Sequence, residues 1–179
     1  AAGYLPAAAA AGWTLSEVAS AGGTGRRADG AIIFGPLILA AGLLLLLFTV
    51  PVAFGLAWLN ISGVVLGLTL AGFGIGLGWP HLLTRVLQQA PEDDREKAGA
   101  SITVVQSFAA ALGAALAGTV ANFAGVDQGD SGAARAAFWM FLLFALPALL
   151  AVWIAWRSVR VRRLHGGAKT SLNGDLSQG

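Results

Sequence analysis

The feature that most constrains this chain is a long run without Lys, Arg, Asp or Glu, from Ala31 to Thr84. The run is about 54 residues long, which is roughly 80 Å as one α-helix at 1.5 Å per residue. One membrane span needs about 20 apolar residues. The run must therefore hold two spans, and Pro51 offers the break between them, because proline interrupts a helix.

The composition agrees with a chain that resides in lipid. Of its 179 residues, 56% are hydrophobic and only 11% are charged, whereas an average soluble domain is about 25% charged. A small soluble domain has too much surface for its volume to hide so much apolar material. These figures argue against a soluble enzyme, a nucleic-acid-binding protein and a disordered chain. We predict an integral membrane protein, an all-α helical bundle.

Two further uncharged runs lie in the second half of the chain, and an Ala-rich stretch precedes the first run. We predict about five transmembrane helices, at about 6–24, 31–50, 59–86, 98–126 and 136–157. The first is the weakest, because it carries Glu17. Residues 1–164 then form one membrane domain, and the Gly/Ser/Asn-rich residues 165–179 are expected to be a disordered cytoplasmic tail. Because the chain starts at Ala1 without a basic leader, we expect it to be part of a longer protein.

The basic residues predict the orientation. If five spans alternate in direction, all of the eleven Lys and Arg except Arg135 fall on one side. Cytoplasmic loops carry the excess of Lys and Arg. We therefore expect a multi-pass protein of the bacterial cytoplasmic (inner) membrane with a cytoplasmic C-terminus. The simplest interpretation of each of these basic residues is that it only orients the protein.

Small residues predict how the helices pack. Glycines, many of them four residues apart, occur in the third and fourth predicted spans, at Gly63, Gly67, Gly72, Gly74, Gly76, Gly78, Gly113 and Gly118. Small side chains let helix backbones approach closely in lipid. We expect these positions to be helix contacts in a bundle that can also bend, although a static bundle explains them equally well.

Polar side chains inside membrane spans are rare, and each is a candidate for a transport pathway. Burial disfavours the charged form of a carboxyl group, so Glu17 could couple transport to protons. Alternatively, a tilted helix brings Glu17 to interfacial water. The Gln106 amide offers two donors and one acceptor to a substrate, or else it bonds to a neighbouring helix.

Four further residues are pathway candidates. His81 and Arg85 are four residues apart and share a helix face near the cytoplasmic end. They could gate or handle protons, or they could simply anchor the helix at the interface. Trp13 and Trp79 do not fit the aromatic belts that mark membrane interfaces. Of all the candidates, we expect Trp13, Glu17 and Gln106 to face the cavity.

The sequence offers little for catalysis or for metal binding. With no Cys and two His, it cannot supply a convincing metal site. No Ser has a recognisable His and acidic partner. We expect neither an enzyme nor a bound cofactor.

Several motifs follow one another in a familiar order. They are Gly72-Phe73-Gly74-Ile75-Gly76-Leu77-Gly78-Trp79-Pro80, Ala90-Pro91 with an acidic loop, Ala98-Gly99-Ala100-Ser101, Val105-Gln106-Ser107 and Leu112-Gly113-Ala114-Ala115-Leu116-Ala117-Gly118. They resemble the tenth and eleventh helices of major facilitator superfamily transporters, above all bacterial drug-efflux-like members. The segment Ala11-Gly12-Trp13-Thr14 with Arg26-Arg27 is similar to the eighth helix and its loop. The stretch from Gly35 to Gly42 is similar to the ninth helix, and the last span is similar to the twelfth.

This resemblance implies proton-coupled efflux of a small hydrophobic or cationic molecule, with the substrate near the midplane between two rocking halves. The expected partners are the lipid bilayer, the small molecule, protons and the missing N-terminal half of the chain. A non-transporting scaffold or accessory subunit is the main alternative, and an intramembrane enzyme would need clustered polar groups. Helix–helix hydrogen bonds that lock Glu17 and Gln106 would favour the scaffold, and their absence would favour transport.

Overall fold

The computed structural model describes residues 4–52 and 57–176, with side chains through residue 160. The described residues form helices and no strands. The helices are α1 (Leu5–Ser20), α2 (Arg26–Thr49), α3 (Ala57–Gln89), the short 3-10 helix η2 (Glu92–Asp94), α4 (Arg95–Phe123) and α5 (Asp130–Leu176). The prediction of an all-α membrane bundle is confirmed, and each predicted span overlaps one long helix.

Within the described residues, four helical stretches are long and apolar enough to cross a membrane: Arg26–Thr49, Ala57–Gln89, Glu92–Phe123 and Asp130–Arg160. The first predicted span is the exception. Helix α1 has 16 residues, or about 24 Å, which is less than the roughly 30 Å of a bilayer's hydrocarbon core. It ends at Ser20, short of the predicted residue 24, because the chain turns through Gly22 and Gly25, both of which have positive φ.

The chain beyond the last span also differs from expectation. We predicted a disordered tail from residue 165, but α5 continues as a helix to Leu176. This segment contains no proline, and a glycine within a helix costs only about 1 kcal/mol relative to alanine, so nothing in it forces the helix to stop. Residues 177–179 of the predicted tail lie outside the described residues.

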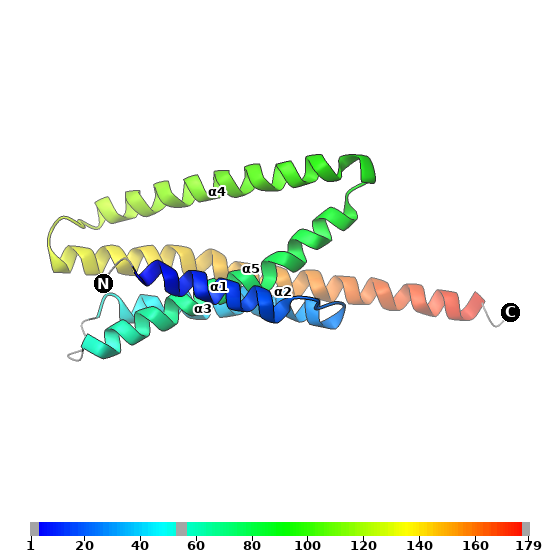
Figure 1. Ribbon diagram of the computed structural model, residues 1–179, viewed down its shortest axis with the longest axis horizontal. Helices are drawn as coiled ribbons and strands as arrows, with labels where there is room; N and C mark the ends of the chain where they lie inside the picture. Colours follow the sequence, from blue (N-terminus) through cyan, green and yellow to red (C-terminus); the bar gives the residue numbers. More distant parts are fainter. Residues whose placement is uncertain (1–3, 53–56, 177–179) are drawn as a thin grey trace.

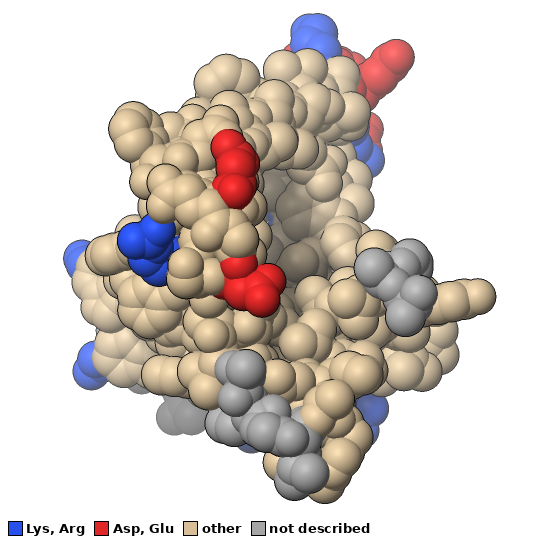
Figure 2. All heavy atoms as spheres, turned by 90° about the vertical axis from the view of Figure 1, so that its left-hand side faces the viewer, with Lys and Arg blue, Asp and Glu red and all other residues tan. Residues whose placement is uncertain are grey.

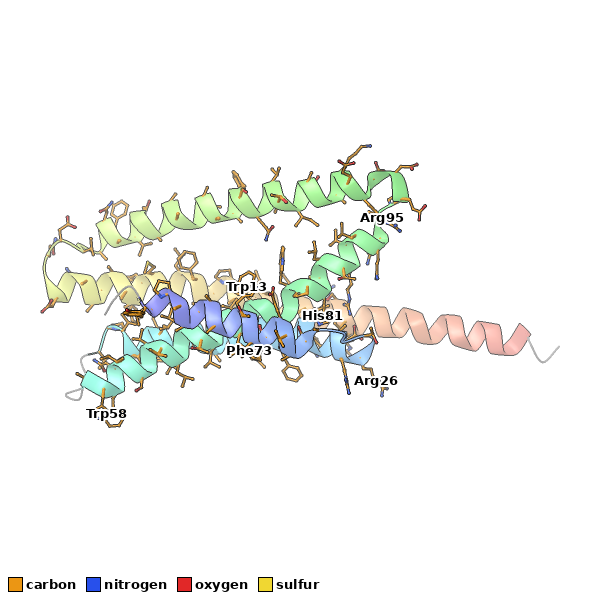
Figure 3. The ribbon with its side chains drawn as sticks, viewed as in Figure 1. Trp13, Arg26, Trp58, Phe73, His81 and Arg95 are labelled. Carbon is orange, nitrogen blue, oxygen red and sulfur yellow. The ribbon has the colours of Figure 1, made fainter. Side chains whose placement is uncertain are left out.

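Consecutive long helices run in opposite directions (Figure 1). Helices α1 and α2 both pack along α3, and α5 packs along α2. Helix α4 is set apart from this group and contacts α5 and α3 only sparsely. Arg26 and Arg95, which begin α2 and α4, lie toward the same end of the molecule, the end from which α5 projects (Figure 3).

One face of α3 packs against α1 at backbone distance. A Cβ atom added to Gly72 would overlap the backbone of Ala9, and one added to Gly76 would lie 2.6 Å from the carbonyl oxygen of Trp13. Gly12 on α1 has the reciprocal position, since its added Cβ would overlap a carbonyl group of α3. The two helices can approach so closely only because these positions have no side chain.

A different set of glycines on α3 receives α2. A Cβ added to Gly74 would lie 2.6 Å from the Gly35 carbonyl oxygen, and one added to Gly67 would lie 2.7 Å from Leu46 Cγ. At Gly63 the contact would be with the Thr49 side chain, also at 2.7 Å. Gly78 is less tightly packed, with its added Cβ 3.6 Å from the Ala31 carbonyl oxygen.

The packing seam predicted along α4 does not form in this structure. An added Cβ on Gly118 would have no atom within 4 Å, and one on Gly113 would lie 3.9 Å from Phe144. None of the described α4 residues is buried. The interpretation of Gly113 and Gly118 as close helix contacts is therefore wrong here, because α4 is held away from the other helices.

The glycine contacts predict a stability difference. Gly72→Ala should lower the free energy of unfolding by about 2 kcal/mol, because overpacking a tight contact costs about 1–3 kcal/mol. Gly118→Ala is the matched control and should be neutral or slightly stabilising, since Ala is the better helix former. Thermal unfolding in detergent measures the stability of both variants. Equal stability of the two would contradict the packing of α1 on Gly72.

Candidate functional site

Trp13 and Glu17 are joined on one face of α1. The Trp13 indole N–H donates to Glu17 Oε1 over 2.6 Å, and both side chains are partly buried. Residues four apart are neighbours on a helix surface. Within the described residues, the carboxylate is therefore held by its own helix and not by another one.

The backbone beneath this pair is anchored on α3. Ser16 is completely buried, and its hydroxyl donates to the Trp13 carbonyl oxygen over 2.8 Å. Gly76 of α3 leaves room for both groups, because an added Cβ there would collide with the Ser16 hydroxyl. The Trp13–Glu17 pair thus lies where α1 packs closely against α3.

Trp79 and Gln106 line a common cavity between α3 and α4. The cavity has a volume of about 630 Å³ and is almost entirely apolar, with Leu82, Val86 and Val105 among its walls. Among the described residues, Gln106 forms no side-chain hydrogen bond. Its side chain is exposed, so its amide is free to bond to a group outside the described residues. Seen from the end that carries the α4–α5 loop, the surface of the molecule is hollowed below α4 (Figure 2).

Arg85 forms an ion pair that the sequence pattern does not predict. Its Nη2 atom lies 2.5 Å from Oδ1 of Asp29, and the two side chains are only 20% and 12% exposed. The pair joins the end of α3 to the first turn of α2. Asp29 was overlooked because it precedes the predicted span 31–50. The sequence did contain a signal for this pair. Asp29 is an acidic residue close to Arg26 and Arg27, and the predicted span 59–86 carries a single arginine, Arg85, which needs a partner if it is buried.

His81 and Arg85 have separate surroundings despite their helical spacing. Arg85 turns to Asp29, whereas His81 lines a second cavity with Arg27 at the α1–α2 loop. Nor do the three residues expected to face one cavity come together. Gln106 lines the α3–α4 cavity, whereas Trp13 and Glu17 are not among its walls, because α4 stands apart from α1.

The chain is similar to curated transporters over most of its length. Two proteins named "probable multidrug-efflux transporter", from the CDC 1551 and H37Rv strains of Mycobacterium tuberculosis, are each 41% identical to it over 130 residues. The aligned region covers 69% of this chain but 26% of each relative. No family model matches the chain, and no solved structure is significantly similar to it.

The Asp29–Arg85 ion pair predicts a measurable coupling. Asp29→Asn should lower the free energy of unfolding by about 3 kcal/mol, because it leaves a largely buried guanidinium without its carboxylate. Arg85→Gln should have a similar effect, and the double variant should lose less than the sum by at least about 1 kcal/mol. Denaturant unfolding of the original protein, the two single variants and the double variant measures this coupling free energy. Strictly additive losses would show that the two side chains do not interact.

Proposed function

We propose that this chain is part of a proton-coupled efflux transporter of the major facilitator type. The observation that carries the proposal is the apolar cavity between α3 and α4, about 630 Å³ in volume, with Gln106 as its one amide. Small-molecule sites are typically apolar with a few convergent polar groups. Small hydrophobic molecules suit such walls, and the similarity to proteins named multidrug-efflux transporters points the same way.

The proposed transporter is longer than this chain, with a further helical half that covers α4. This helix exposes large apolar side chains, among them Phe108 at 70% and Val104 at 68%. The aligned region covers only 26% of the length of the relatives. A second half packed against α4 would close the α3–α4 cavity on its open side, at the interface where such transporters bind substrate.

Glu17 is the proposed proton-coupling residue. Its carboxyl group is partly buried, and its hydrogen-bond partner is Trp13 of the same helix. A carboxyl group that is not hydrogen-bonded to another helix can take up and release a proton as its surroundings change. This arrangement supports transport over the scaffold alternative, which would need Glu17 and Gln106 to hold helices together.

We further propose that the end with most basic residues faces the cytoplasm of a bacterium, at its inner membrane. Besides Arg26 and Arg95, this end holds Arg157 and Arg160 of α5, whose guanidinium groups lie 5.3 Å and 5.1 Å from the rings of Trp153 and Trp156. Such Trp and Arg residues are typical of a cytoplasmic membrane interface. In this proposal the protein moves its substrate without altering it chemically and is not an enzyme.

The scaffold alternative has one observation in its favour. The glycine contacts of α3 with α1 and α2 are so close that these three helices could serve as a rigid unit. The proton-transport experiment below separates the two functions.

Replacing Glu17 tests proton coupling. In the full-length protein reconstituted in vesicles, Glu17→Gln should reduce proton-driven export of ethidium to the level of empty vesicles, because the amide cannot take up the proton. Exchange of ethidium without a proton gradient should persist. Glu96→Gln, an equivalent change at an exposed position of α4, should export normally. Undiminished export by Glu17→Gln would remove this role from Glu17.

Replacing Gln106 tests the cavity. Gln106→Leu should weaken ethidium binding about fivefold, because one hydrogen bond contributes about 1 kcal/mol. Ser107→Ala is the matched control: it removes a polar group from the next position, which does not line the cavity, and should bind normally. Ethidium fluorescence gives both affinities. Equal affinities for the two variants would place the substrate elsewhere.

A further inference from the structure

A second cavity lies where the chain turns from α1 into α2. It has a volume of about 350 Å³ and is bounded by residues 19–23, the first turns of α2, and Leu77 and His81 of α3. The loop packs directly on α3, since an added Cβ on Gly23 would lie 3.4 Å from Cε1 of His81. This cavity shares no lining residue with the one that holds Gln106. It therefore needs an explanation other than substrate transport.

The rim of this cavity is positively charged. Arg27 and His81 line it, and none of its lining residues, all of which belong to the described part of the chain, is acidic. Within that part, neither side chain forms a hydrogen bond or an ion pair. No side chain caps the start of α2, and the acidic residue of its first turn, Asp29, is paired with Arg85 and does not line this cavity.

The floor of the cavity is apolar. Below the rim it is lined by Ala31, Phe34 and Leu77, and Phe34 remains 56% exposed. The cavity thus offers hydrogen-bond donors to an anion at its rim and an apolar surface to a hydrocarbon chain at its floor. Anionic phospholipids have this combination, and basic pockets between membrane helices bind their head groups.

We propose that this cavity binds the phosphate group of an anionic phospholipid. The Arg27 guanidinium contacts two phosphate oxygens, a geometry for which its planar fork is suited. The His81 imidazole donates a further N–H from α3, and Phe34 contacts the first part of an acyl chain. A bound phosphate links the α1–α2 loop to α3.

The proposal is tested by lipid binding to the full-length protein in a neutral detergent. Native mass spectrometry during titration with phosphatidylglycerol counts the bound lipids. Arg27→Gln should weaken this binding about fivefold, since one basic residue near a membrane surface contributes about 1 kcal/mol. Arg26→Gln removes the same charge one position away, from an exposed side chain that does not line the cavity, and should leave binding unchanged.

The other outcomes are equally informative. If both variants weaken binding alike, the attraction comes from general surface charge and the proposal fails; if neither does, it fails as well. Phe34→Ala should weaken binding of phosphatidylglycerol but not of inorganic phosphate. If the cavity binds inorganic phosphate but not phosphatidylglycerol, the proposed lipid ligand is wrong. Should Arg27→Gln not fold, His81→Leu removes the facing donor and should weaken phosphatidylglycerol binding in the same direction.

Discussion

The structure depends on how closely other helices approach the backbone of α3. Gly72 and Gly76 admit α1, and Gly67 and Gly74 admit α2, each at distances that leave no room for a Cβ atom. Apolar burial gives helices in lipid little reason to associate, so close van der Waals packing must hold them together. The glycines of α3 provide that packing on two faces at once.

The other features of α3 follow from this arrangement. With two faces occupied by α1 and α2, its face that carries Trp79 and Leu82 is left for α4 and forms the apolar cavity. The close approach of α2 also brings Asp29 to Arg85 at the end of α3. Among the described residues this is the one ion pair between long helices. The other two, Arg95–Glu92 and Lys97–Asp94, each join the start of α4 to η2 three residues earlier.

Transport and lipid binding would use different sides of the same helix. Trp79 and His81 are two residues apart on α3, yet they line separate cavities, because successive residues of a helix point about 100° apart. One cavity faces α4 and is apolar; the other lies under the α1–α2 loop and has a basic rim. The structure therefore presents two chemically distinct cavities on one helix.

The sequence by itself determined the class of the molecule and its helices. Uncharged runs of span length and glycines at helical spacing depend only on local geometry and on the solvent, so the all-α bundle and the glycine contacts of α3 could be predicted. The end of α1 could not be placed, because positive φ at Gly22 and Gly25 is one of several conformations open to glycine.

Only the tertiary structure decided which residues meet. Asp29 lies 56 positions from Arg85 in sequence, and helical periodicity carries no information on such a separation. The same holds for Gln106, which faces Trp79 and not Trp13 because α4 stands apart from α1. Periodicity tells which residues share a face of one helix, whereas the packing of whole helices decides what that face contacts.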